Sequence, residues 1–76
     1  MAQTDRGVLL ILYRSTDGPN WERKTHWNTD VQISKWHGVK VNYQGRVVKL
    51  ELVENNLRGR IPEELGKLTA LQKLDL

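Results

Sequence analysis

Cysteine is absent from the 76 residues of this sequence. No disulfide can therefore stabilise the fold, and no cysteine pattern indicates an oxidising compartment. A chain of this length lies near the lower limit at which one hydrophobic core outweighs the entropy of the unfolded chain, so missing cross-links matter. The thiolate ligands of common zinc sites are missing as well.

Long apolar runs and blocks of like charge are also absent. Twelve Lys and Arg residues are scattered among nine Asp and Glu residues, giving a net charge of +3. This distribution predicts solubility and no nucleic-acid partner. The longest apolar run, residues 8–12, is too short to span a bilayer and lacks a small-residue cleavage site, so no membrane segment or retained signal peptide is expected. Cytoplasmic localisation is the prediction, and an extracellular location after removal of a leader is the alternative.

Catalytic and metal-binding groupings are missing too. His26 and His37 have Asp30 between them, but no third or fourth ligand lies at zinc spacing. Ser15, Asp17 and His26 could supply a nucleophile, an orienting group and a base only on paper, because no nucleophile elbow fixes them together. No glycine-rich loop could hold a phosphate. We therefore predict no enzyme activity, no metal and no cofactor.

The first element present is a short helix. Thr4 can cap its amino end, Asp5 suits the positive end of the helix dipole, and the apolar run extends the helix to about Arg14. Residues 15–20, "STDGPN", are all turn formers or proline and must end the helix.

Three tryptophans, Trp21, Trp27 and Trp36, follow in a polar stretch without helical or strand periodicity. Large indoles in irregular chain usually anchor loops to a core, with the ring buried and its N–H bonded to a carbonyl. An aromatic cage or a sugar-stacking platform is the alternative.

A β-hairpin is predicted over residues 38–52. The sequence alternates on either side of a reversal at residues 42–45, where Gly45 can adopt positive φ. The inward-facing residues of the hairpin are predicted to be Val39, Val41, Val48, Leu50 and Leu52.

The end of the sequence repeats part of itself. Val47, Leu50 and Leu52 reappear 24 residues later as Leu71, Leu74 and Leu76 (71 − 47, 74 − 50, 76 − 52). A period in the twenties with this spacing is typical of leucine-rich repeats, in which a strand is followed by a turn and a return segment.

Each position of the repeat has a physical role. Leu50 and Leu52 point inward, while Lys49, Glu51 and Val53 point to the opposite face. Asn55 is placed where its amide can satisfy backbone groups that leave the sheet. A helical turn begins near Ile61, with Pro62 at its first position and two carboxylates at its positive end. The predicted core residues of the return segment are Leu57, Ile61, Leu65 and Leu68.

The segment "LRGRIPEELGKLTALQKLDL" resembles the plant-type leucine-rich repeat, Leu-x-Gly-x-Ile-Pro-x-x-Leu-Gly-x-Leu. Residues 1–46 resemble the N-terminal capping domain of such proteins, chiefly through "LLILYRSTDGPNW" and "WHGVKVNYQGRVVKLEL". Secreted plant caps carry cysteines near the Trp-x-Gly-Val motif, whereas this chain reads "ISKWHGVKV" there. It is closer to the cysteine-free caps of protist and bacterial repeat proteins, which weakens any expectation of secretion.

The resemblance implies an α/β fold that starts a leucine-rich-repeat solenoid. Residues 1–46 would form the cap, with a helix, a Trp-containing loop and the first hairpin strand. Residues 47–76 would form the first repeat and the opening strand of a second. A cap of this kind covers the apolar end of a solenoid. The resemblance assigns structural roles to Trp21, Trp36, Gly38, Leu50, Leu52 and Asn55, with both indoles locking the cap loops and Gly38 allowing close backbone approach.

The implied function is a non-catalytic module that binds a protein or peptide on a concave strand face. The predicted contact residues are Lys49, Glu51, Val53, Glu54, Lys73 and Asp75. The alternative is a structural capping or self-assembly unit that oligomerises through an open C-terminal strand, with Leu71, Leu74 and Leu76 at the contact. A third hypothesis, an appendage of an enzyme such as a receptor-like kinase or a GTPase, rests on family analogy alone.

Overall fold

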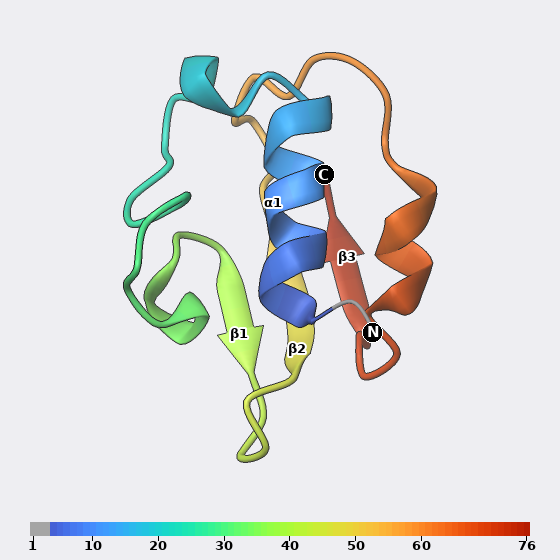
Figure 1. Cartoon of the computed structure of the whole chain (residues 1–76). Helices are drawn as coiled ribbons and strands as arrows, with labels where there is room; N and C mark the ends of the chain where they lie inside the picture. Colours follow the sequence, from blue (N-terminus) through green and yellow to red (C-terminus); the bar gives the residue numbers. More distant parts are fainter. Residues whose placement is uncertain (1–3) are drawn as a thin grey trace.

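A three-stranded sheet with one helix over its face forms the centre of the molecule (Figure 1). This computed structural model describes residues 4–76, so the first three residues of the predicted cap lie outside the described range. The elements in chain order are α1 (Asp5–Ser15), η1 (Gly18–Asn20), η2 (Ile33–Lys35), β1 (Val39–Val41), β2 (Val47–Glu51), η3 (Glu63–Lys67) and β3 (Lys73–Asp75), where η denotes a 3-10 helix.

Strand β2 occupies the middle of the sheet, with β1 antiparallel on one side and β3 parallel on the other. The register places Leu50 opposite Val39 of β1 and opposite Leu74 of β3. The predicted hairpin is therefore present, and Gly45 in its turn has a φ of +79°. The repeat period also appears in space, because residues 24 apart pair across β2 and β3.

Helix α1 begins as the sequence indicates. The Thr4 hydroxyl accepts a hydrogen bond from the Gly7 N–H at 3.0 Å, and the helix ends at Ser15, one residue beyond the predicted end. At its carboxyl end the Thr16 hydroxyl donates to the Leu12 carbonyl at 2.6 Å. No helix within residues 4–76 is both long and apolar enough to cross a bilayer.

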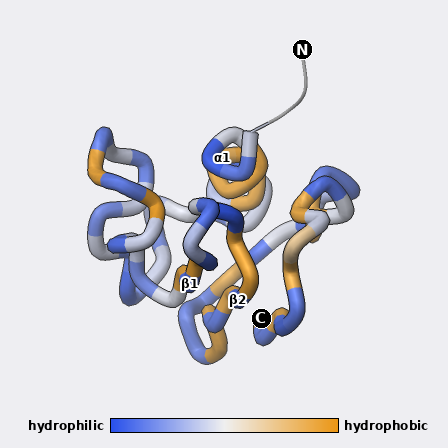
Figure 2. The backbone as a smooth tube through the Cα atoms, turned by 90° about the horizontal axis from the view of Figure 1, so that it is seen from below, coloured by the Kyte–Doolittle hydropathy of each residue, from blue (hydrophilic) through white to orange (hydrophobic). Residues whose placement is uncertain are grey.

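The core lies between α1 and the sheet, with irregular segments closing it on both sides (Figure 2). Helix α1 contributes Val8, Leu9 and Leu12, all with no exposed surface. The return segment contributes Leu65 and Leu68, as predicted, while Leu57 packs against the core from a half-buried position. The sheet contributes Val39, Val47 and Leu50 to the core, and Leu52, directly after β2, is buried with them.

The alternation predicted for β2 is wrong at its first residues. Val47 is fully buried and Val48 is half-buried, whereas the sequence pattern placed Val48 inward. The pairing of β1 with β2 is irregular between Lys40 and Val41, so Val41 lies opposite Val47. Such an irregularity breaks the two-residue period of side-chain direction at that point.

The predicted core position of Ile61 is also wrong, because this side chain is 46% exposed. Pro62, which precedes η3, has extended backbone and occupies the cap position rather than the first helical position. Ile61 therefore lies in the extended approach to η3, and the return segment reaches the core only at Leu65 and Leu68.

Candidate protein-interaction face

The face of the sheet turned away from α1 carries charged side chains from all three strands. We call it the outer face and define it by Lys40, Lys49, Glu51, Lys73 and Asp75. Lys49 lies opposite Lys40 of β1 and Lys73 of β3, and Glu51 lies opposite Asp75. Directly paired residues project to the same side of a sheet, so these five side chains share one surface.

Two ion pairs run along the strands of the outer face. The Lys49 ammonium lies 2.6 Å from Glu51 Oε1, and the Lys73 ammonium lies 3.6 Å from Asp75 Oδ2. The hydrogen bond from Lys49 and then its charge lower the pKa of the Glu51 carboxyl below its ordinary value, with smaller contributions from the charges of Lys73 and Lys40. All four paired side chains stay partly exposed and accessible to a partner.

The structure brings four of the six predicted contact residues together: Lys49, Glu51, Lys73 and Asp75. The other two, Val53 and Glu54, are exposed but lie in the turn after β2 rather than on a strand, and Glu54 has a φ of +57°. Lys40 shares the outer face but was missed by the sequence analysis. The alternation Val39-Lys40-Val41 could have revealed it, because a polar residue between two inward-facing valines projects outward.

Asn55 joins the repeat to the cap loop. Its side-chain oxygen accepts a hydrogen bond from the Arg23 N–H at 2.6 Å, and its side-chain amide donates to the Arg23 carbonyl at 2.7 Å. The side chain is buried, and both of its polar atoms have partners. The amide does bind backbone groups, but these belong to Arg23 in the Trp-containing loop, 32 residues away, and not to residues that leave the sheet as predicted.

Gly38 allows the backbone just before β1 to approach the end of β2. Its φ is +79°, and a Cβ at this position would lie 2.3 Å from the Glu51 carbonyl oxygen. The Glu51 N–H donates to the Gly38 carbonyl at 2.8 Å. The close approach expected of Gly38 is therefore present.

The three tryptophans anchor the loop between η1 and β1. Their side chains are only 2–4% exposed. Trp21, Trp27 and Trp36 each donate an indole N–H to a backbone carbonyl, at 2.9 to 3.0 Å. The rings pack in sequence, with centroids 4.8 Å apart for Trp21 and Trp27 and 5.0 Å for Trp27 and Trp36. The alternative of an aromatic cage or sugar platform is wrong, because no indole face is left exposed.

An arginine extends this anchoring to α1. The Arg6 guanidinium donates to the carbonyls of Thr29 and Val31 at 2.6 and 2.7 Å, and its central carbon lies 5.2 Å from the centroid of Trp36. The cation is thus held against an aromatic face while its donors bind the loop backbone.

A buried carboxylate links the start of α1 to β2. Asp5 Oδ2 accepts hydrogen bonds from Arg46 Nε at 3.0 Å and from the Val47 N–H at 2.8 Å. Arg46 also donates to the hydroxyl of Thr69, just after η3, at 3.0 Å. The hydrogen bond to Asp5 and its charge raise the pKa of Arg46. This link was not predicted, since 41 residues separate its two charged members.

The far edge of the sheet is uncovered. Leu71 is half-buried against the core, while Leu74 and Leu76 are 43% and 40% exposed. Leu74 pairs in register with the fully buried Leu50, so it lies on the inward side of the sheet. The three leucines predicted for self-association therefore lie at the uncovered end of the core.

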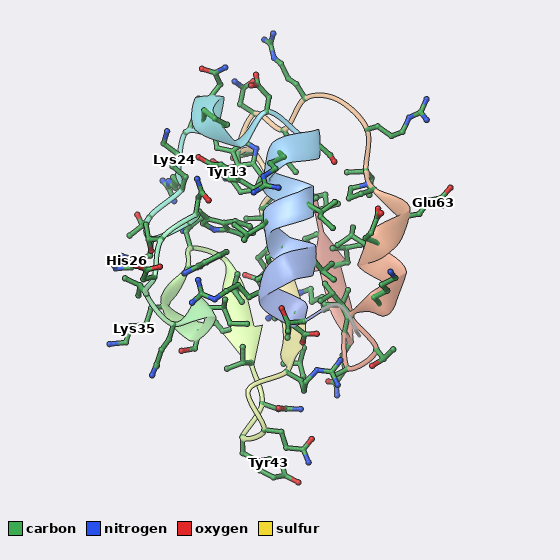
Figure 3. The ribbon with its side chains drawn as sticks, in the orientation of Figure 1. Tyr13, Lys24, His26, Lys35, Tyr43 and Glu63 are labelled. Carbon is green, nitrogen blue, oxygen red and sulfur yellow. The ribbon has the colours of Figure 1, made fainter. Side chains whose placement is uncertain are left out.

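The residues considered for catalysis or metal binding are not brought together. His26 lies on the outside of the loop, and no hydrogen bond joins it to Ser15 or Asp17 (Figure 3). His37 is half-buried, and its backbone carbonyl accepts the Trp27 indole N–H. Across residues 4–76, no group of three or more His, Asp or Glu side chains could hold a metal ion.

Comparison with known proteins identifies the relatives of this chain. It is 35% identical to leucine-rich repeat protein 1 of Arabidopsis thaliana, across 99% of this chain and 34% of that protein. It is 34% identical to a probable leucine-rich repeat receptor-like protein kinase of the same plant, across 90% of this chain and 8% of the kinase. The homologues of this chain are leucine-rich-repeat proteins. No protein-family profile matches it.

Solved structures agree with this result. A leucine-rich-repeat protein from Bacteroides eggerthii superposes with a TM-score of 0.80 at 30% identity, over 92% of this chain and 12% of that one. A second, from Bacteroides thetaiotaomicron, gives 0.78 at 27% identity, over 92% and 10%. The fold is the start of a leucine-rich-repeat solenoid, as predicted. The chain spans at most about a third of the length of these relatives. In the relatives whose names include kinase, it matches the leucine-rich-repeat region.

Proposed function

We propose that this chain is the N-terminal cap and first coil of a leucine-rich-repeat array, and that its outer face binds a protein or peptide. The leucine-rich-repeat relatives support an interaction module in general terms. The observation that supports the outer face in particular is the continuous row of partly exposed charged side chains across all three strands.

The proposed cap is supported by the way residues 4–46 cover one side of β2. Helix α1 lies over the core, and the Trp-anchored loop closes the side beyond β1 (Figure 1). The hydrogen bonds of Asn55 to Arg23 and of Gly38 to Glu51 tie these segments to the first coil. The polar surface of the loop, which includes Lys24, His26 and Lys35, faces outward (Figure 3). Such a cover is what a solenoid needs at its first coil.

The proposed binding face can be mapped by site-specific photo-crosslinking. A photoreactive amino acid replaces Lys49 or Lys73 in one pair of variants and Tyr43 or Glu63 in a control pair. The control positions lie at the hairpin tip and on η3, and both side chains point away from the body (Figure 3). We expect protein adducts in a cell extract from the first pair and few from the second.

Charge substitutions then test the contact directly. Replacing Lys49 and Glu51 with alanine is expected to weaken capture of a crosslinked partner, because both side chains lie at the centre of the face. Adducts formed only from Tyr43 or Glu63, or partner binding indifferent to Lys49 and Glu51, would show that the binding face lies elsewhere.

Self-association is the second candidate function, and the exposure of Leu74 and Leu76 beside the unpaired edge of β3 favours it. An apolar edge of this kind is a template for pairing with another chain. We expect the sedimentation mass of the chain to rise with concentration, and the variant with Leu74→Glu and Leu76→Glu to remain monomeric. A folded unsubstituted monomer at high micromolar concentration would contradict this candidate.

A further inference from the structure

Three lysines stand side by side on the outer face. Lys40 pairs with Lys49, and Lys49 pairs with Lys73, so one lysine from each strand forms a row across the sheet. Neighbouring strands lie about 5 Å apart. Like charges placed directly opposite one another destabilise a sheet, so the row is an arrangement that the fold alone does not favour.

The carboxylates of the face neutralise two members of the row. Glu51 pairs with Lys49, and Asp75 pairs with Lys73. The matching position on β1 is Gly38, whose carbonyl accepts the Glu51 N–H and which carries no side chain. Lys40 is exposed, and among residues 4–76 it forms no ion pair within 4.0 Å. The outer face therefore has three cations and two carboxylates, with the unmatched charge on β1.

We propose that the outer face binds an acidic polypeptide segment that places carboxylates over the row formed by Lys40, Lys49 and Lys73. This inference rests on the proposed function for its location and adds the chemical class of the partner. A carboxylate near Lys40 supplies the missing countercharge and reduces the repulsion between Lys40 and Lys49. Each ammonium has three donors, so Lys49 and Lys73 can bind a second carboxylate while keeping the first.

The carboxylates of the outer face favour a polypeptide over a nucleic acid. Glu51 and Asp75 form a second row, two residues along the strands, with Cα atoms about 7 Å from those of the lysine row. A sugar-phosphate backbone broad enough to cover the face would bring phosphates against these carboxylates. A narrow line of side-chain carboxylates, flanked by neutral or basic residues, fits both rows.

The experiment uses a fluorescein-labelled oligoglutamate peptide as the probe and measures its anisotropy with the 76-residue chain at low ionic strength. We expect saturable binding that weakens as salt rises. Lys40→Glu removes one attraction and adds a repulsion, so its dissociation constant is expected to rise by about fivefold. Lys40→Ala is expected to give a smaller rise, by about twofold.

Lys67→Glu is the matched control, because it makes the same change in net charge on η3, away from the outer face. Its dissociation constant is expected to stay within about a factor of two of the unsubstituted chain. Lys40→Ala is expected to stay folded, because it relieves repulsion within the sheet and leaves the buried core untouched. Tryptophan fluorescence on urea titration confirms that each variant is folded.

Two results would overturn the proposal. Equal weakening of peptide binding by Lys40→Glu and Lys67→Glu would mean that the binding depends only on the net charge of the chain. Equally tight binding of an oligothymidine through the same three lysines would assign the face to nucleic acid instead.

The proposed function and this inference fail in different ways. Crosslinks from Lys49 and Lys73 combined with peptide binding that is insensitive to Lys40→Glu would leave the face assigned and overturn only its acidic partner. Crosslinks confined to Tyr43 or Glu63 would instead contradict the assignment of the outer face as the binding face, whatever the result of the peptide titration.

Discussion

Two nearly identical segments of this chain have opposite environments. Residues 49–52 read "KLEL" and residues 73–76 read "KLDL". Their strands are parallel neighbours in register. Leu50 and Leu52 are 0% and 1% exposed, whereas Leu74 and Leu76 are 43% and 40% exposed. The difference lies in what surrounds each pair. Leu50 and Leu52 are enclosed by α1 and the Trp-anchored loop, whereas Leu74 and Leu76 have β2 on one side only.

The comparison shows that one repeat does not bury its own leucines. A coil supplies an inward-facing surface, and the neighbouring layer determines whether that surface meets protein or water. In this chain the layer beside the first coil consists of α1 and the Trp-anchored loop, which have a different sequence and form the cap in the proposed function. These segments enclose the leucines of β2 as a following coil would enclose those of β3.

Leucine truncation should give the largest contrast between the two segments. Leu50→Ala is expected to lower the free energy of unfolding by about 3 kcal/mol, because it removes buried methyl groups and leaves a cavity. Leu74→Ala is expected to cost less than about 1 kcal/mol, since its side chain already contacts water. Urea denaturation followed by tryptophan fluorescence measures both.

Extending the chain sharpens the same comparison. A second copy of residues 53–76, appended after Leu76, would place a further layer beside β3. The cost of Leu74→Ala should then approach that of Leu50→Ala. If both truncations cost the same in the original chain, the difference in environment would not control their energetics.

Gly38 should be the next most sensitive position, because it closes the cap over the end of β2. Gly38→Ala forces a side chain into positive φ and against the Glu51 carbonyl, so we expect a loss of about 2 to 3 kcal/mol. Gly66→Ala is the control, since a Cβ there meets nothing within 4 Å, and it should change stability by less than about 0.5 kcal/mol. Similar urea midpoints for the two variants would show that the cap does not depend on this close approach.

Asn55 tests the tie between the first coil and the cap loop. Asn55→Ala leaves the Arg23 N–H and carbonyl without their partners, and we expect a loss of about 2 kcal/mol. Asn20→Ala removes an exposed hydrogen bond to Asp17 and should cost less than about 0.5 kcal/mol. Thermal or urea unfolding of the pair measures the difference, and equal losses would mean that the buried amide is dispensable.

Local patterns were sufficient to predict most of the fold. The Thr4 cap and the hairpin turn at Gly45 depend on residues close in sequence, and both are present. The 24-residue period is visible as a repeated pattern, and it is also present. The burial of the three indoles also followed from their size and their irregular surroundings. The position of Val48 was mispredicted because the irregular pairing at Val41 depends on the partner strand and not on β2 itself.

Contacts between distant residues could not be predicted in the same way. Asp5 meets Arg46 and Val47 across more than 40 residues, and nothing near Asp5 in the sequence distinguishes it from an ordinary helix-start carboxylate. The candidate face was located by the repeat pattern, but its lysine row needed the register that places Lys40 beside Lys49. The contact role of the face and the cytoplasmic location stay predictions.

The smallest expected effect concerns the polar side of the same two segments. The Lys49 hydrogen bond and charge hold the pKa of Glu51 below its ordinary value, so the folded chain binds a proton at Glu51 less readily than the unfolded chain does. This favours the folded state above the unfolded pKa, and the stabilisation is lost as the pH falls from that unfolded pKa through the lower pKa of the folded chain. As the pH falls over that range, the free energy of unfolding should therefore drop slightly less for Glu51→Gln than for the unsubstituted chain. Added salt should reduce the difference, because the ion pair is exposed.

Urea midpoints at several pH values measure this difference. Glu63→Gln is the control, because Glu63 has no ion pair within residues 4–76. If Glu51→Gln and Glu63→Gln changed the pH dependence equally, the short Lys49–Glu51 pair would have no special contribution on the outer face.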